Sequence, residues 1–445
     1  MKIRRMLAVW AAKTAGFVCR KMGRQGVTWA GKIALKICPA ILEELSAQVR
    51  EKIFVVCGTN GKTTTNNMLC AALEAEGKKV ICNHTGSNML NGVVAAFVLG
   101  AKLNGNLDAD YACIEADEAS TRYIFPAVKP DYMVLTNLFR DQLDRYGEID
   151  ITMKILEEMI QKVPGLTVIV NGDDALSAYL ALNSGHPLIT YGISRPVIKS
   201  AASEIREGRF CKCCGERLQY SFYHYSQLGD YRCPKCGFAR PALTYDAQEV
   251  SVGEQLSFCV EGRRLVANYK GFYNVYNILA AYAGIRTAGF SGEHFQEMLT
   301  RFNPENGRME QFRIKGCGIV LNLAKNPAGF NQNISAVMQD SSPKDIIIAI
   351  NDNAQDGIDI SWLWDVDFDL FRDESIHSIT VSGIRCQDMR LRLKYVDISS
   401  MLEEDVEKAI QSRIEDGVGN LYVLVNYTAL FSTRNILKKL EGEKA

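Results

Sequence analysis

The stretch that decides the fold is residues 53–65, which reads IFVVCGTNGKTTT. Its first five residues are apolar and mostly β-branched or aromatic, as in a buried strand, and residues 66–73 have the composition of a helix. A strand, a glycine-containing loop with a lysine, and a helix form the usual phosphate-binding unit, in which backbone N–H groups and the helix N-terminus surround the phosphate. The pattern therefore predicts a nucleoside triphosphate site in an α/β domain. A glycine-rich turn that merely joins a strand to a helix is the alternative.

Individual residues of this loop have separate expected roles. Lys62 is expected to reach the outer phosphate oxygens, and Thr63 is expected to bind Mg²⁺. Val56 stands where the usual nucleotide loop has a glycine, so the loop is a shortened variant. The expected nucleotide-binding residues are Gly58, Thr59, Asn60, Gly61, Lys62, Thr63 and Thr64.

Length and composition describe a large protein without overall charge. The chain has 445 residues, which is room for two or three domains, and its 51 Lys and Arg residues balance 51 Asp and Glu residues. This balance lacks the charge excess of nucleic-acid-binding proteins. No apolar run is long enough to span a membrane, and no signal peptide is recognisable. The fourteen cysteines are therefore interpreted as reduced thiols and metal ligands of a cytoplasmic protein.

The first 50 residues are predicted to be helical and are strongly basic. Between Met1 and Leu42 there are nine Lys or Arg residues and no acid. Trp10 and Phe17 share a helical side with Lys13, so the amphipathic pattern is poor. Two interpretations stay open, namely a solvated basic helix packed on the next domain, or contact with the anionic inner face of the plasma membrane.

From residue 51 to about residue 200, predicted strands and helices alternate, which is typical of a parallel sheet. Ligands of such sheets gather beyond the carboxyl ends of the strands. The predicted strand at residues 111–114 carries Glu115, Asp117 and Glu118 at that end. Glu115 is the expected Mg²⁺ ligand if this strand lies beside the strand that precedes the phosphate loop, and an ordinary surface acid is the alternative.

Residues 205–245 interrupt the alternation with two Cys-x-x-Cys pairs. Cys211 and Cys214 are followed after 18 residues by Cys233 and Cys236. This spacing is typical of a zinc ribbon, in which four thiolates hold Zn²⁺ in a closed structural site, and Cys213 is then the spare thiol. Basic and aromatic residues nearby would allow nucleic-acid contact, but single ribbons often serve purely as structural inserts.

A polar stretch around residue 303 predicts a domain boundary, and a second α/β unit follows it. Its strands are expected at residues 318–321, 346–350, 378–382 and 421–425. The loop from Asp352 to Asp359 is its most acidic one. This loop is either a solvated turn or a segment whose acid faces the active site of a partner protein. Asp356 is the preferred acid, because Gly357 lets the backbone turn, and Asp352 is the second choice.

Together these motifs resemble the Mur ligase family of ATP-dependent amide-bond-forming enzymes, over residues 51 to about 330 and more loosely to the end. The loop at residues 58–63 looks like the ATP loop of that family, and Glu115 stands at its Mg²⁺-binding glutamate. Four further positions match family motifs that contact or approach the nucleotide: the adenine-contacting asparagines Asn274 and Asn277, the linker arginine Arg308, and Asn322, which replaces an acid.

The resemblance implies a domain organisation. It implies a Mur-ligase-like central ATP-binding domain with a parallel sheet at residues 51–303, interrupted by the Cys₄ zinc ribbon at 205–245. The basic helical segment 1–50 precedes it, in place of the family's UDP-sugar domain, and a C-terminal α/β ligase domain occupies 304–445. Gln142 replaces a metal-binding histidine, and no lysine stands near Leu156 where many members carbamoylate one. These departures leave the number of catalytic Mg²⁺ ions open.

The short front, the ribbon and the acidic loop are similar to the branch of the family that amidates lipid II. This likeness implies ATP-dependent amidation of the D-glutamate α-carboxyl of the lipid II stem peptide through an acyl phosphate. Ammonia would come from a GatD-like glutaminase subunit, in a heterodimer or larger complex. Lys62, Glu115 with its Mg²⁺, and Arg308 would neutralise charge during phosphoryl transfer.

Two other functions stay open. The first is a ligase that adds an amino acid, as in folylpolyglutamate synthesis, and the amine donor would separate it from an amidating enzyme. The second is a zinc-ribbon nucleic-acid-binding ATPase. The neutral overall charge weighs against the second, so no nucleic-acid partner is expected.

Overall fold

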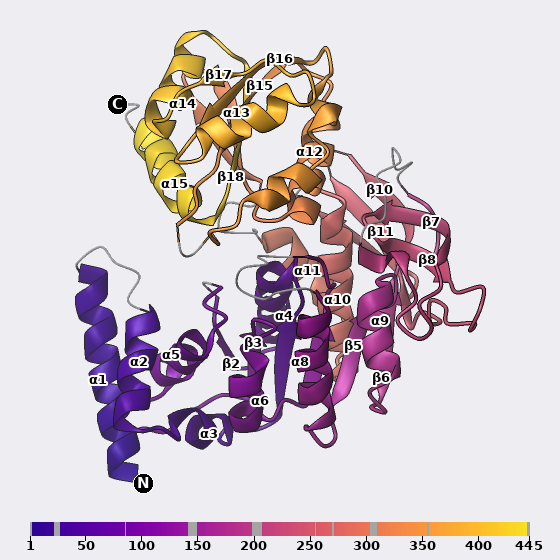
Figure 1. The fold of residues 1–445 in the computed structure, drawn as a ribbon. Helices are drawn as coiled ribbons and strands as arrows, with labels where there is room; N and C mark the ends of the chain where they lie inside the picture. Colours follow the sequence, from indigo (N-terminus) through magenta and orange to yellow (C-terminus); the bar gives the residue numbers. More distant parts are fainter. Residues whose placement is uncertain are drawn as a thin grey trace. The chain divides into compact units, whose positions relative to one another are not determined.

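The computed structural model describes residues 2–21, 27–84, 86–140, 149–197, 207–253, 255–268, 271–302, 309–353 and 356–442. These residues form two compact units, drawn in Figure 1 with colours that follow the sequence. The first unit is built mainly from Met1–Phe139, Ile149–Asn268 and Tyr273–Phe302, and the second mainly from Asn303–Ala445. The predicted boundary at residues 303–304 lies outside the described residues, as do Arg308 and Gln142.

A seven-stranded sheet forms the centre of the first unit. Its order is β2-β3-β1-β4-β5-β6-β9, and every neighbouring pair is parallel, which confirms the predicted parallel sheet. Val56 of β1 lies opposite Glu115 of β3. The strand that carries Glu115 is therefore the neighbour of the strand that precedes the phosphate loop, as the expected Mg²⁺ role of Glu115 requires. The strands are β1 Lys52–Cys57, β2 Val80–Cys82, β3 Tyr111–Glu115, β4 Tyr132–Leu135, β5 Thr167–Asn171, β6 Leu188–Gly192 and β9 Tyr245–Asp246.

Helices cover both faces of this sheet, and the central strand is therefore apolar throughout. Residues 54–57 of β1 are fully buried, as expected for a strand covered on both sides. Ile53 and Val55 share an apolar cluster with α5, α6 and α8, whereas α4 packs against α10. The helices are α4 Lys62–Ala75, α5 Leu90–Gly100, α6 Thr121–Val128, α8 Ile149–Gln161, α9 Ala175–Leu182, α10 Tyr273–Thr287 and α11 Phe295–Arg301.

The N-terminal segment is helical, as predicted, and it packs on the first unit. It contains α1 (Lys2–Lys21), α2 (Val27–Ile37) and α3 (Ile41–Ser46). The residues of α1 and α2 that reach the core are mostly small, and the alanines at positions 8, 12, 30 and 34 are fully buried beside the apolar residues of α5 and β1. None of the helices in the described part of the chain is long and apolar enough to cross a membrane.

The insertion after β6 is built from short antiparallel strands. The first pair is a hairpin, and the second group is a three-stranded sheet. Their bounds are β7 Gln219–Tyr225, β8 Leu228–Arg232, β10 Gln248–Val252, β11 Leu256–Val260 and β12 Arg263–Ala267.

The second unit has its own six-stranded sheet, in the order β13-β14-β18-β15-β16-β17. Only β13 is antiparallel to its neighbour in this described sheet. All four strands predicted here are confirmed. The strands are β13 Glu310–Ile314, β14 Cys317–Leu323, β15 Lys344–Ala349, β16 Ile376–Ser382, β17 Met401–Leu402 and β18 Asn420–Val425, and the helices are α12 Pro327–Met338, α13 Cys386–Lys394, α14 Val406–Glu415 and α15 Tyr427–Gly442.

Candidate active site

The loop between β1 and α4 needs its two glycines. Gly58 and Gly61 have φ angles of 121° and 82°, in the left-handed region that side chains disfavour. A Cβ atom on Gly58 would lie 2.3 Å from Thr136 Oγ1, and one on Gly61 would lie 2.1 Å from Asn277 Oδ1. The loop therefore packs against two neighbouring segments so closely that only glycine fits.

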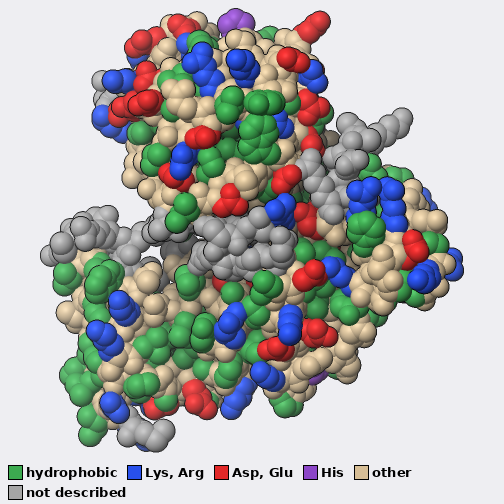
Figure 2. Space-filling view, viewed as in Figure 1, with side chains coloured by type: hydrophobic (Ala, Val, Ile, Leu, Met, Phe, Trp, Pro, Cys, Tyr) green, Lys and Arg blue, Asp and Glu red, His purple; other side chains and the backbone are tan. Residues whose placement is uncertain are grey.

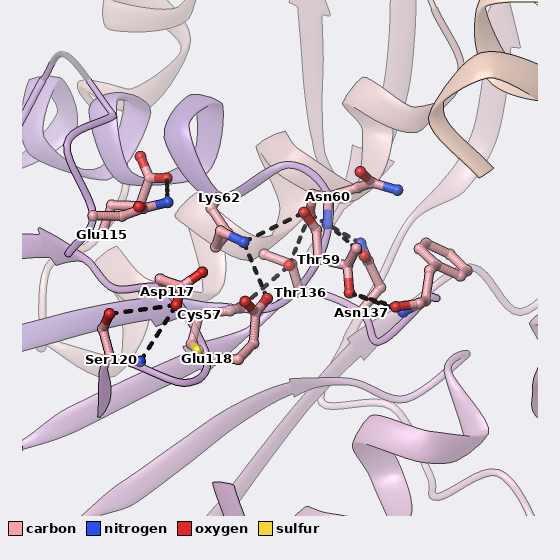
Figure 3. A network of polar contacts seen from close by, with 12 residues as sticks. Cys57, Thr59, Asn60, Lys62, Glu115, Asp117, Glu118, Ser120, Thr136 and Asn137 are labelled. Carbon is pink, nitrogen blue, oxygen red and sulfur yellow. Dashed lines mark hydrogen bonds and ion pairs between the residues drawn. The ribbon is translucent and has the colours of Figure 1, made fainter. Parts of the chain in front are cut away.

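The end of β4 holds this loop in place (Figure 3). Asn137 accepts hydrogen bonds from the Thr59 backbone N–H to its carbonyl oxygen (2.8 Å) and from the Asn60 N–H to its Oδ1 (2.9 Å). The Thr136 hydroxyl donates to the Asn60 carbonyl oxygen at 2.8 Å. Sequence reasoning missed Thr136 and Asn137, which directly follow β4 beside β1 at the carboxyl edge of the sheet. These bonds fix the loop before any nucleotide arrives, which is the preorganisation that phosphoryl transfer requires.

Lys62 is a buried cation with a buried partner. Its side chain is 6% exposed, and its Nζ lies 3.0 Å from Glu118 Oε1, whose side chain is 7% exposed. Burial lowers the pKa of Lys62, but the nearby acids Glu118, Asp117 and Glu115 outweigh it and raise the pKa above its usual value. The lysine is therefore charged, and a phosphate in the loop would compete with Glu118 for its ammonium group. Sequence reasoning placed Glu118 at this edge but assigned it no role.

The residues around Glu115 fit a divalent cation. Asn88 Nδ2 donates to Glu115 Oε1 at 2.9 Å, whereas Oε2 is buried and has no hydrogen-bond partner among the described residues. A Cβ atom built on Gly86 would lie 3.3 Å from Thr63 Oγ1 and 3.6 Å from Glu115 Oε2, so both oxygens approach the same small space. A buried carboxylate oxygen beside a hydroxyl is the donor set that Mg²⁺ prefers. These two predicted ligands are thus brought together, and Mg²⁺ held there would supply positive charge beside the phosphate loop.

The asparagine pair also lies at the loop. Asn274 and Asn277 sit one turn apart in α10, and Asn277 Nδ2 donates to Asn274 Oδ1 at 3.0 Å. Asn277 Oδ1 accepts from Thr65 Oγ1 in the first turn of α4 at 3.5 Å. The adjacent Thr64 is buried in the same turn. The position of Asn277 against Gly61 therefore places α10 beside the expected nucleotide.

Two other predicted residues belong to the second unit. Arg308 lies outside the described residues. Asn322, near the end of β14, is buried and donates from Nδ2 to Asn333 Oδ1 at 2.6 Å, while its Oδ1 accepts from the Met309 N–H at 3.2 Å. These contacts link β14 to α12 and to the start of β13.

The acids of the loop after β15 have contacts inside the second unit. Asp352 pairs with Arg385 at 2.6 Å, and Asp359 accepts from the Ser361 N–H at 2.8 Å. Asp356 is buried and accepts hydrogen bonds from the backbone N–H of Thr428 (2.8 Å) and from its hydroxyl, at the start of α15. Burial raises the pKa of Asp356, although the bonds from Thr428 act in the opposite direction. Asp356 is therefore held firmly in one orientation.

Four cysteine sulfurs converge in the insertion. The Sγ atoms of Cys211, Cys214, Cys233 and Cys236 all lie within 4.8 Å of one another, and the pairs 211–236 and 214–233 are each 3.5 Å apart. Sulfurs on a tetrahedral Zn²⁺ with Zn–S bonds of about 2.3 Å are roughly 3.8 Å apart, so the cluster fits the ion. Cys213 is exposed and stands outside the cluster.

A second group of possible metal ligands was not predicted from the sequence. Cys70, Cys82 and His84 place one donor atom each within 4.8 Å of one another. Asn66 Nδ2 donates to Cys82 Sγ at 3.2 Å. Three donors are one fewer than a closed structural zinc site uses, and we assign no metal to them.

Two protein families match this chain. The Mur ligase middle domain family matches residues 56–230, and the MurT ligase C-terminal family matches residues 323–430. Among solved structures, a pseudomurein peptide ligase type C from Methanothermus fervidus is similar, with a TM-score of 0.69 and 22% identity, over 88% of this chain and 79% of that one. MurF from Acinetobacter baumannii gives a TM-score of 0.65 and 16% identity, over 92% and 80%. These structural likenesses show a shared fold.

Two curated relatives match almost end to end. A protein from Staphylococcus aureus (strain COL) is 35% identical over 430 residues, which cover 96% of each chain. A protein from Streptococcus pneumoniae (strain ATCC BAA-255 / R6) is 32% identical over 443 residues, which cover 98% of each chain. Both are named lipid II isoglutaminyl synthase (glutamine-hydrolyzing) subunit MurT.

Proposed function

The chain belongs to the MurT family of Mur ligases, and from this premise we propose that it is the ligase subunit of a lipid II isoglutaminyl synthase. The observation that carries the proposal is identity of 35% over 96% of both chains with a relative of that name. The reaction is ATP-dependent amidation of the D-glutamate α-carboxyl of the lipid II stem peptide to D-isoglutamine. A carboxylate is a poor electrophile, so the γ-phosphoryl group of ATP is first transferred to it, and ammonia then displaces phosphate from the acyl phosphate.

The residues of the first unit support this chemistry. The backbone N–H groups at the N-terminus of α4 would surround the phosphates, because those of Thr59 and Asn60 already donate to Asn137. The Lys62 ammonium would neutralise charge on the moving phosphoryl group. Glu118 keeps that lysine charged and aimed until the nucleotide takes its place. Thr63 and Glu115 would hold Mg²⁺. By resemblance, Asn274 and Asn277 contact the adenine, and Arg308 and Asn322 are further nucleotide-binding candidates.

Ammonia would come from a GatD-like glutaminase subunit, because the named relatives are glutamine-hydrolysing subunits. Asp356 is our candidate for the acid that orients the catalytic histidine of that partner, with Asp352 second. The acid of a Cys-His-acid triad is typically buried and hydrogen-bonded, and the contacts of Asp356 with Thr428 would hold it in that way. The same contacts also suit a purely structural role at the start of α15.

The proposal is tested with the full chain and the glutaminase subunit of the same organism. Lipid II, ATP and Mg²⁺ are supplied with glutamine, ammonium or glutamate, and the stem peptide is analysed by mass spectrometry. Amidation with glutamine and with ammonium, and only in the presence of ATP, is the expected result. Addition of a whole glutamate residue would instead indicate a folylpolyglutamate-type ligase. ATP hydrolysis stimulated only by nucleic acid would indicate a zinc-ribbon nucleic-acid-binding ATPase.

We further propose that Cys211, Cys214, Cys233 and Cys236 bind one structural Zn²⁺. Four thiolates leave no open position on the ion, so zinc would stabilise the insertion rather than take part in amidation. Cys233→Ser should lose zinc and lower the unfolding temperature, whereas Cys213→Ser, the matched control, should keep both unchanged. Metal analysis and thermal unfolding measure the two outcomes, and full zinc retention by Cys233→Ser would contradict the ligand set.

A further inference from the structure

Helix α1 has two apolar sides, one buried and one largely exposed. The packed side carries small residues such as Ala8, Ala12 and Gly16, which let α1 lie close to its neighbours. Its large apolar side chains point the other way. Their positions fall within about 100° of one another around a helix of 3.6 residues per turn, which places them in one stripe along the helix. The stripe consists of Ile3 (71% exposed), Leu7 (48%), Trp10 (45%), Phe17 (55%) and Val18 (47%).

Two further exposed apolar side chains lie on segments that contact α1. Trp29 of α2 is 60% exposed, and Leu103, whose carbonyl oxygen accepts a hydrogen bond from Trp10 Nε1 at 2.6 Å, is 64% exposed. We call these seven residues the apolar stripe. Contiguous exposed apolar side chains of this size typically mark an interaction surface.

Basic side chains border the apolar stripe. Lys2, Arg4 and Lys32 are exposed, and the Lys32 ammonium lies 5.5 Å from the centre of the Trp29 ring. The first acid of the chain is Glu43, beyond both helices. Figure 2 shows hydrophobic and basic side chains together over the part of the molecule where Figure 1 draws α1 and α2. The border therefore complements a negatively charged surface.

We propose that the apolar stripe and its basic border bind the surface of an anionic phospholipid bilayer. Helix α1 would lie in the plane of the interface, with its large side chains about 5–10 Å deep and its cations among the headgroups. The exposed Trp10 and Trp29 suit this depth, because indole rings favour the boundary between headgroups and acyl chains. This inference is drawn from the exposed surface of α1 and α2. The biological use of membrane binding rests on the proposed function, since binding would bring the ligase to a substrate held in the membrane.

Vesicle flotation of the full chain tests the proposal. The wild-type protein should float with vesicles of equal parts phosphatidylglycerol and phosphatidylcholine, and much less with phosphatidylcholine alone. Leu7→Gln with Phe17→Gln should weaken binding at least about 30-fold, since two large apolar groups would stay in water. The matched control is Leu391→Gln with Ile151→Gln, two helical residues with nearly the same exposure, 48% and 54%. This control should bind normally.

The charged border is tested separately. Arg4→Gln with Lys32→Gln should weaken binding to the anionic vesicles by about 30-fold, at roughly fivefold for each cation, and should leave binding to neutral vesicles unchanged. Lys315→Gln with Lys394→Gln removes two exposed cations of the second unit and should have no effect. Circular dichroism checks that each variant is folded.

Several outcomes would overturn the proposal. One is failure of the wild-type chain to float with anionic vesicles, and another is an equal loss of vesicle binding in the stripe and control variants. A third is a stripe variant that still floats but no longer binds the glutaminase, which would make the stripe a protein interface. Failure of the proposed function gives a different result, namely no amidation of a water-soluble lipid II analogue by any variant. If both proposals hold, stripe variants amidate the soluble analogue normally and lipid II in vesicles poorly.

Discussion

The two units of this protein each place a polar loop after a central parallel strand, and the two loops differ in how their charges are satisfied. After β1, Lys62 is buried against Glu118, and Glu115 keeps one buried oxygen that accepts no hydrogen bond from a described residue. After β15, Asp352 has Arg385 and Asp356 has Thr428 as partners. Both loops therefore lie at the carboxyl edge of a sheet. What distinguishes a ligand site is a buried polar atom whose hydrogen-bonding capacity is not used within the protein.

The largest expected effect concerns the loop after β15. The question is whether this loop acts on the glutaminase subunit although its acids have partners within the second unit. Asp356→Asn keeps the size of the side chain and removes its charge. If Asp356 orients the catalytic histidine of the glutaminase, glutamine-driven amidation should fall by a factor on the order of 10²–10⁴, and ammonium-driven amidation should not change. Both rates are measured on the reconstituted complex.

Two control variants separate orientation from structure. Thr428→Val removes the hydroxyl that contacts Asp356, and Asp352→Asn removes the partner of Arg385. Both should retain most glutamine-driven activity if the charge of Asp356 is what matters. A Thr428→Val variant as inactive as Asp356→Asn, or equal loss with ammonium and glutamine, would show that the loop only supports the second unit.

Lys62→Ala tests the first loop directly. It removes the cation aimed at the transferring phosphoryl group, so amidation should fall by about 10²–10³ with either nitrogen source. Because the change removes the ammonium group from the buried carboxylate of Glu118, it should also destabilise the fold. The double variant Lys62→Ala with Glu118→Gln should recover stability in thermal unfolding but not activity. Near-normal amidation by a folded Lys62→Ala variant would refute the assignment of the phosphate loop.

The sequence predicted the strands, the loop and the cysteine cluster because each depends on local patterns. An apolar run of strand length, a Gly-x-x-Gly-Lys loop and a pair of Cys-x-x-Cys motifs can each be recognised from residues that are close together in the sequence. The pairing of Lys62 with Glu118 and the support from Asn137 could not be predicted in the same way, because they depend on which strands become neighbours and on side-chain direction.

The N-terminal helices show the same limit. Their helical state followed from composition, but the sequence pattern mixed Trp10 and Phe17 with Lys13 and suggested no clean amphipathic face. In the structure, Lys13 turns inward to the Leu99 carbonyl oxygen at 2.5 Å, and the aromatic residues remain outside. A long flexible cation can fold back in this way, so a helical wheel misjudges its direction.

The smallest expected effect concerns Glu115. It tests directly whether the buried Oε2 atom, which accepts no hydrogen bond from a described residue, marks a metal site. Glu115→Gln should raise the Mg²⁺ concentration needed for half-maximal amidation by about 10–100-fold. Asn88→Ala frees the other carboxylate oxygen and should have a weaker effect in the same direction. Thermal unfolding without nucleotide gives an independent measurement. Mg²⁺ should raise the unfolding temperature of the wild-type protein, because it binds only the folded state.

The same change should act in the opposite direction when no metal is present. A buried carboxylate with one unsatisfied oxygen destabilises the fold, and a neutral amide of the same shape removes that charge. Glu115→Gln should therefore unfold at a higher temperature than the wild-type protein in EDTA, and Mg²⁺ should leave its unfolding temperature unchanged. If the variant is instead destabilised in EDTA and still responds to Mg²⁺, then Glu115 is a structural acid, and the first loop would be no different from the second.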